Sequence, residues 1–90
     1  MKFEKQNRLL KLLKAASNAN RLKILQILAE VKTPINVTAL VDRVGVSQAT
    51  LSNHLATMRS AGVISAKQDG QNMFYSIKDE AIVKLLKILD

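Results

Sequence analysis

The sequence contains no cysteine and only one histidine, His54. The lack of cysteine excludes disulfide bonds, thiolate metal sites and thiol redox sensing, and one imidazole is too few for a histidine-rich metal site. No apolar run approaches the ~18 residues that span a bilayer, and the charged first residues lack the apolar core of a signal peptide. We therefore expect a cytoplasmic protein with no metal, no cofactor and no membrane partner.

Acidic and aromatic residues are also scarce. Seven Asp and Glu stand against 14 Lys and Arg, which gives the 90 residues a formal net charge of +7. Such an excess suggests a polyanionic partner, either nucleic acid or an acidic membrane. Aromatic residues make up 3% of the chain, too few for a platform that stacks single-stranded bases. The 48% of hydrophobic residues indicate a folded domain rather than a disordered basic tail.

The chain has only three glycines and one proline. No Pro/Gly/Ser-rich run, repeat or low-complexity stretch divides it, so residues 1–90 are expected to form a single domain. The sequence shows no paired carboxylates, no nucleophile–base set and no phosphate-binding glycine loop, and therefore does not indicate an enzyme.

Two helices are predicted in the first third of the chain. Residues 3–16 place apolar side chains at helical spacing, with basic side chains on a different face. Residues 17–20 favour helix caps and separate this helix from a second one. The second helix is apolar around most of its circumference, which favours a central position, and Pro34 requires it to end.

A helix-turn-helix is predicted next. Residues 35–37 are β-prone but very short, and Thr38 is expected to cap a short third helix. Gly45 breaks that helix and supplies the backbone freedom of a turn. A longer helix over 47–61 follows, capped by its first residue, and Gly62 suits its C-terminal end. A short helix, a glycine turn and a longer helix are typical of helix-turn-helix proteins.

A β-hairpin and a last helix complete the pattern. Residues 63–67 and 73–77 read as strands, and the intervening residues 68–72 contain Asp-Gly, a strong hairpin signal. Acidic residues then open a final helix over 79–89. The predicted fold is mainly α with a small β-hairpin wing, in the order α-α-β-α-α-β-β-α.

The outer face of helix 47–61 is the strongest functional signal. Leu51, Leu55 and Met58 form one apolar stripe that should pack on the protein body. The opposite face consists of small or polar side chains and has no Lys or Glu. Its members, with two flanking residues, are Ala49, Ser52, Asn53, Ala56, Ser60, Gln48 and Arg59. Small residues allow close approach to a duplex, and Gln and Asn amides can pair with adenine in the major groove. The alternative is an ordinary polar surface.

Other residues near this helix have less specific roles. His54 lies beside the apolar stripe, where a half-buried ring bonded to a backbone or hydroxyl group is expected, with a phosphate contact as the alternative. At the hairpin, Lys67, Gln71 and Asn72 can touch phosphates or the minor groove, unless the hairpin ends in a plain solvent turn. Phe74 and Tyr75 lie on opposite faces of one strand, so one of them should be core.

Five strings in order resemble the ArsR type of winged helix-turn-helix repressor. They are 18–25, 35–40, 45–55, 59–64 and 74–77. The resemblance implies a homodimer that pairs through the helices near 3–16 and 79–89. The leucines that would form the interface are Leu9, Leu10, Leu12, Leu13, Leu85, Leu86 and Leu89.

The resemblance also implies which residues read DNA. The family's reading positions fall on Gln48, Ala49, Ser52 and Asn53, of which Ala49 offers only contact with a thymine methyl. Together with the neighbouring Thr50, these positions form the core of the predicted DNA-binding set. Metal-sensing members carry cysteines where this chain has Asn36 and Thr38, or an Asp/His set where it has only Asp79. Neither a metal-responsive nor a thiol-responsive switch is therefore expected.

The basic residues are unevenly distributed. Residues 1–45 carry a net charge of +6 and residues 46–90 only +1. Helix ends near Arg21, Lys23 and Arg43 are candidates for phosphate contacts. The alternative is that the basic first helix serves a different partner, such as an anionic membrane.

The sequence thus predicts a transcription regulator specific for double-stranded DNA. We expect a homodimeric repressor that binds an imperfect palindrome through helix 47–61 and wing 67–73. The alternative from another class is a winged-helix module that binds proteins and does not touch DNA.

Overall fold

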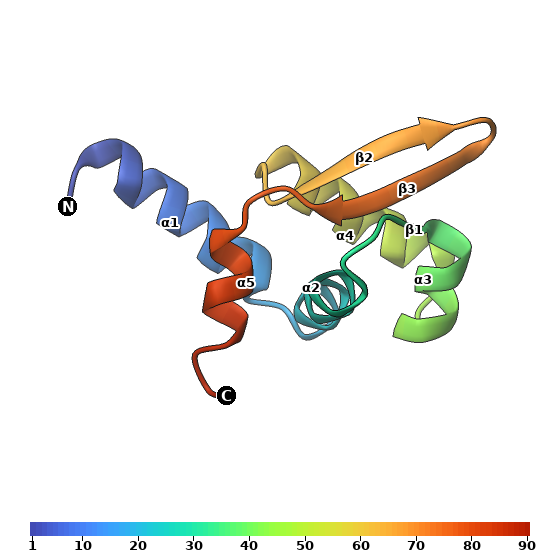
Figure 1. Ribbon diagram of the computed structural model, residues 1–90, viewed down its shortest axis with the longest axis horizontal. Helices are drawn as coiled ribbons and strands as arrows, with labels where there is room; N and C mark the ends of the chain where they lie inside the picture. The colour runs from blue at the N-terminus through green and yellow to red at the C-terminus, as the bar shows by residue number, and fades with distance from the viewer.

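The computed structural model describes residues 1–90 and contains five helices and three strands (Figure 1). Their order agrees with the sequence prediction. The elements are α1 (Phe3–Ala16), α2 (Ala19–Val31), β1 (Ile35–Asn36), α3 (Val37–Val44), α4 (Gln48–Ser60), β2 (Ile64–Asp69), β3 (Asn72–Ile77) and α5 (Ala81–Leu86). None of the helices is long and apolar enough to cross a bilayer.

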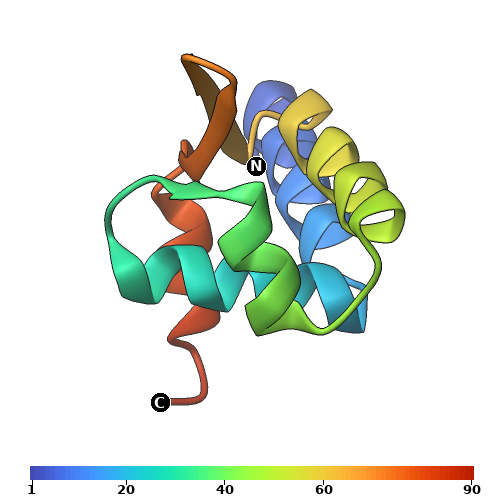
Figure 2. The ribbon, with the colours of Figure 1, turned by 90° about the vertical axis from the view of Figure 1, so that its right-hand side faces the viewer.

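Helix α2 lies at the centre, with the other helices and the sheet around it (Figure 2). Its side chains Ile24, Leu25, Ile27 and Leu28 are all buried, as its apolar circumference predicts. Asn18 caps it through a side-chain oxygen that accepts from two backbone N–H groups. The first half of α1 projects from the body (Figure 1), and every residue from 1 to 11 is exposed.

The sheet is antiparallel with the strand order β1-β3-β2. Asp69 pairs with Asn72, so the hairpin loop has only two residues, Gly70 and Gln71. Gly70 has φ 63° while Gln71 has a negative φ, which is the pattern of a type II′ turn. The prediction of a hairpin is confirmed, but the predicted five-residue loop is too long because the strands pair almost to the tip. Tyr75 packs against the core, as expected for one of the two aromatic neighbours.

Two details of the helix ends differ from the prediction. Asn36 rather than Thr38 caps α3, because the helix begins earlier and the Asn36 Oδ1 accepts from the Ala39 N–H at 2.9 Å. Helix α5 is shorter than 79–89. Beyond Leu86 the backbone continues in turns with i→i+3 hydrogen bonds, since exposed residues such as Leu89 pack on nothing that would hold a regular helix.

Candidate nucleic-acid interface

The turn between α3 and α4 fixes the direction of α4. Gly45 has φ 81°, in the left-handed region, and its N–H donates to the Val41 carbonyl at 3.0 Å. Ser47 then caps α4, because its Oγ accepts from the Thr50 N–H at 3.1 Å. Both predicted signals, the glycine turn and the serine cap, are confirmed.

Helix α4 has one buried side and one free side. Leu51, Leu55 and Met58 are at most 1% exposed and anchor the helix in the core. The opposite side is exposed at Gln48, Ala49, Ser52, Asn53, Ala56, Arg59 and Ser60. No segment of the chain covers this side, so it is free to approach a ligand surface.

Thr50 and His54 lie at the border between the two sides and are half-buried. The Thr50 Oγ1 accepts from the Ser47 hydroxyl at 2.9 Å, so this side chain takes part in the cap. His54 is half-buried as expected, but the expected bond is not formed. The side-chain hydrogen bonds on α4 belong to Ser47, Thr50 and Thr57.

The β2–β3 hairpin extends away from the body beside α4 (Figure 1). Lys67, Gln71 and Asn72 are exposed on it. The Gln68 Nε2 donates to the Gly70 carbonyl at 3.1 Å, which holds the tip. The hairpin therefore carries one exposed cation, the exposed carboxylate of Asp69 and several amides.

Two of the three predicted phosphate contacts are engaged within the fold. The Arg21 guanidinium donates to the Ala15 and Lys14 carbonyls, each at 3.0 Å, and so caps the end of α1. The Lys23 Nζ donates to the Val44 carbonyl at 3.1 Å and ties α2 to the end of α3. Arg43 is 44% exposed, and its ion pair with a Glu30 carboxylate oxygen is long, at 4.0 Å. A phosphate role for these residues stays a prediction, and Arg43 is the one best placed for it.

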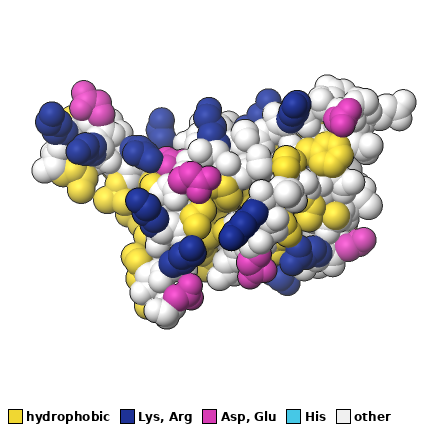
Figure 3. Space-filling model, in the orientation of Figure 1, with side chains coloured by type: hydrophobic (Ala, Val, Ile, Leu, Met, Phe, Trp, Pro, Cys, Tyr) yellow, Lys and Arg dark blue, Asp and Glu magenta, His cyan; other side chains and the backbone are white.

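The predicted dimer leucines divide into buried and exposed groups. Leu12 is 6% exposed and belongs to the chain's own core, so it is not available to a second copy. On α1, Leu9, Leu10 and Leu13 are 37–46% exposed. Phe3, which the sequence pattern did not indicate as an interface residue, is 75% exposed. Near the other end, Leu85 and Leu86 are half-buried and Leu89 is exposed. Figure 3 shows apolar side chains below α1 and along α5.

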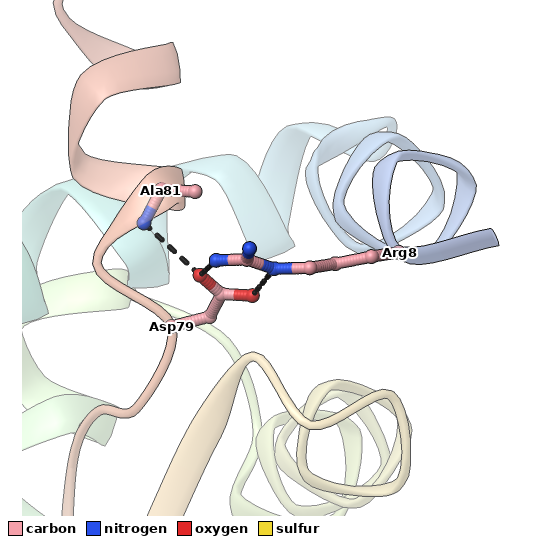
Figure 4. A network of polar contacts seen from close by, with 3 residues as sticks. All are labelled: Arg8, Asp79 and Ala81. Carbon is pink, nitrogen blue, oxygen red and sulfur yellow. Dashed lines mark hydrogen bonds and ion pairs between the residues drawn. The ribbon is translucent and has the colours of Figure 1, made fainter. Parts of the chain in front are cut away.

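An ion pair that the sequence did not reveal joins α1 to the segment before α5 (Figure 4). The Arg8 Nε and Nη2 donate to the two carboxylate oxygens of Asp79 at 2.8 and 2.5 Å. Asp79 also accepts from the Ala81 N–H at 3.0 Å. The hydrogen bond from Arg8 lowers the pKa of the Asp79 carboxyl. No local pattern predicts this pair, because its members are 71 positions apart.

An anchored second helix with a free outer side, followed by a hairpin, defines the winged helix-turn-helix class, in which such a helix enters the DNA major groove. Residues 18–66 match the profile of the family described as bacterial regulatory protein, arsR family. The chain belongs to the ArsR family of DNA-binding transcription regulators and is not an enzyme. It has no cysteine and no group of three or more metal-ligating side chains.

Relatives of known sequence and structure agree with this membership. Nodulation protein NolR of Rhizobium meliloti is 40% identical over 77 residues, which cover 86% of this chain and 62% of NolR. The transcriptional repressor PagR of Bacillus anthracis has a similar structure, with a TM-score of 0.88 and 29% identity over 99% of this chain and all of PagR. The homodimeric winged helix-turn-helix DNA-binding domain Mb0332 of Mycobacterium bovis gives a TM-score of 0.81 at 26% identity, covering 99% of this chain and 83% of that domain. Similar proteins are named both as repressors and as activators.

Proposed function

We propose that this chain is a homodimeric repressor that binds an imperfect palindrome in double-stranded DNA. The observation that carries the proposal is the exposed outer side of α4. Its side chains are small or uncharged in the first turns of the helix, while the leucines on the other side of α4 are buried in the core. Exposed helix faces without a ligand are commonly rich in Lys and Glu. A face of amides, hydroxyls and methyl groups matches the edges of base pairs instead.

Five residues of this face have a chemical role toward DNA. The Gln48 and Asn53 amides offer a donor and an acceptor together, which suits the N6 and N7 atoms of adenine. Ala49 contacts a thymine methyl, and Ser52 bonds to a base or a phosphate. Arg59 at the end of α4 and Lys67 on the wing add phosphate contacts that position the helix without reading sequence.

The exposed apolar side of α1 supports a dimer. Several large side chains of α1 stand in solvent in the single chain, and half-buried leucines of α5 continue the patch. The similar domain Mb0332 is homodimeric, which supports a dimer for this chain as well. A twofold dimer presents two α4 helices about one turn of DNA apart, roughly 34–36 Å, and so requires two inverted half-sites.

Repression is the mode of action that needs only DNA binding. A dimer that occupies a promoter excludes the polymerase without any further domain. PagR, which has a similar structure, is a transcriptional repressor. A promoter–reporter assay tests it. Deletion of the gene should raise expression from the bound promoter, and a fall in expression would identify an activator.

Selection of bound sequences from random duplexes tests the binding itself. We expect an enriched motif with inverted half-sites. On the enriched duplex, Gln48→Ala and Asn53→Ala should each weaken specific binding by about 1–3 kcal/mol, roughly 5- to 150-fold, while non-specific binding stays the same. Gln26→Ala on the exposed side of α2, which also removes an uncharged amide, is the matched control. An unchanged ratio of specific to non-specific affinity in both α4 variants would refute the assignment of reading residues.

A further inference from the structure

Helix α1 is attached to the body along one side. Arg8, Leu12 and Ala15 share that side, because spacings of four and three residues bring side chains to one face of a helix. Leu12 and Ala15 are buried in the core, whereas every residue from 1 to 11 is exposed. Arg8 makes the only side-chain hydrogen bonds between residues 1–11 and the rest of the chain. The ion pair with Asp79 therefore extends the attachment of α1 by one turn beyond the core.

Asp79 joins α1 to two further parts of the fold. In Figure 4 it lies between Arg8 and Ala81, whose N–H donates to the Asp79 carboxylate at 3.0 Å at the start of α5. The backbone N–H of Asp79 donates to the Val63 carbonyl at 3.1 Å. Val63 is buried between α4 and β2, and its own N–H donates to the Met58 carbonyl of α4 at 3.1 Å. A series of hydrogen bonds thus connects α1 with the end of the reading helix.

We propose that Asp79, held by Arg8, is a positioning residue for operator binding that sets the angle between α1 and α4. The inference rests on the proposed function, in which α1 carries dimer contacts and α4 reads the DNA. The exposed leucines of α1 lie about 100–160° around the helix from Arg8, so the ion pair leaves them free for a second copy. The angle of α1 to the body then determines the separation and orientation of the two α4 helices in the dimer.

A small change of this angle is enough to alter recognition. Two reading helices about 34–36 Å apart each lie about 17 Å from the twofold axis, so a tilt of about 10° moves one of them by roughly 3 Å. That shift is close to the rise of one base pair. The buried and half-buried residues of α1 are confined to its last five positions, from Leu12 to Ala16. The ion pair, about 6 Å further along the helix, limits the tilt and with it the half-site spacing that the dimer accepts.

The preference for half-site spacing tests the proposal. Inserting or deleting one base pair between the half-sites of the selected palindrome rotates one half-site by about 34° and shifts it by about 3.4 Å. We expect the wild-type protein to lose roughly tenfold in affinity for either duplex, similar to the loss from a mismatched base pair. In R8Q and D79N the same changes should cost less than about threefold, because the DNA selects among further α1 angles that these variants populate. Affinity for a duplex with one intact half-site should stay unchanged.

E30Q is the matched control. It removes one carboxylate from the other ion pair of the chain, which joins α2 to α3, and should keep the wild-type spacing preference. The readout is a ratio of affinities, so the general effect of a lost negative charge cancels. D79N retains an oxygen for the Ala81 N–H, and R8Q leaves Asp79 intact, so the start of α5 is preserved in both.

Two further variants separate positioning from stability. The double variant R8Q/D79N should discriminate between spacings as either single variant does and no worse, because both changes act through one pair. R8K keeps the charge without the two parallel donors and should give an intermediate preference. Circular dichroism and sedimentation check that each variant is folded and dimeric, and R8K replaces R8Q if R8Q does not dimerise.

Two results would overturn the inference. A wild-type spacing preference in both R8Q and D79N would show that the pair contributes to stability alone. A loss of affinity for one half-site as large as the loss for the whole palindrome would place the effect within α4. The proposed function fails separately, if the wild-type protein is a monomer or selects no inverted half-sites.

Discussion

Replacing Leu55 with alanine tests whether the buried side of α4 anchors the reading helix. Leu55 is 1% exposed and belongs to a core of 14 buried residues. The change removes three carbon atoms, which cost about 2.4 kcal/mol at ~0.8 kcal/mol each. The enclosed position leaves a cavity that adds about 1 kcal/mol. We therefore expect a loss of about 3–4 kcal/mol in the free energy of unfolding.

That loss is a large part of the total stability. A chain of 90 residues has roughly 5–13 kcal/mol available, so L55A should remain folded only marginally. Urea denaturation followed by circular dichroism, at one fixed protein concentration, measures the change. A midpoint lowered by roughly 2 M corresponds to the expected loss.

Ser52→Ala is the matched control on the opposite side of α4. Ser52 is exposed and makes no side-chain hydrogen bond within α4, so its stability should change by less than about 0.5 kcal/mol. Its affinity for the selected duplex should fall while that stability is kept. The reasoning is refuted if L55A costs less than about 1 kcal/mol, or if S52A destabilises the protein as much as L55A does.

Three other predictions concern the turn, the ion pair and the dimer. Gly45→Ala should cost about 1–2 kcal/mol in urea denaturation, because a Cβ is strained at φ 81° although no neighbour crowds it, and Gly45→Asn should cost less. Asp79→Asn should lower the unfolding free energy at pH 7. Because Arg8 lowers the pKa of Asp79 in the folded state, this stabilisation is present above the unfolded pKa of ~3.9 and is lost as pH falls through the folded value, so the two denaturation curves should converge in acid. A constant difference from pH 7 to 2 would contradict that assignment. Leu10→Glu should shift sedimentation from dimer to monomer with the helical content kept, whereas a dimer of wild-type affinity would place the interface elsewhere.

The reading helix shows how far local patterns reach. The period of Leu51, Leu55 and Met58 determines which side of α4 is buried, and the opposite side is then exposed wherever the helix sits. Ser47 and Gly45 specify where α3 stops and α4 starts through bonds to near neighbours. The candidate face could be predicted because each of these effects acts within a few residues.

The partners of charged groups could not be predicted in this way. Helix ends and basic charge favour contacts of Arg21 and Lys23 with DNA phosphates. In the fold their donors meet carbonyl oxygens at the ends of α1 and α3. A cation is engaged when packing brings the carbonyl oxygens of a helix end within about 3 Å of it. The sequence does not show which helix ends come that close.

The sequence alone determined the order of the elements, the turns and the two sides of each long helix, because periodicity, caps and glycine conformation are local. Only the tertiary structure decided that Leu12 is core while Leu13 is exposed, that Arg8 holds Asp79, and that α5 ends at Leu86. These outcomes depend on groups distant in the chain meeting in space. Such a contact contributes to stability only once packing has brought its two partners together.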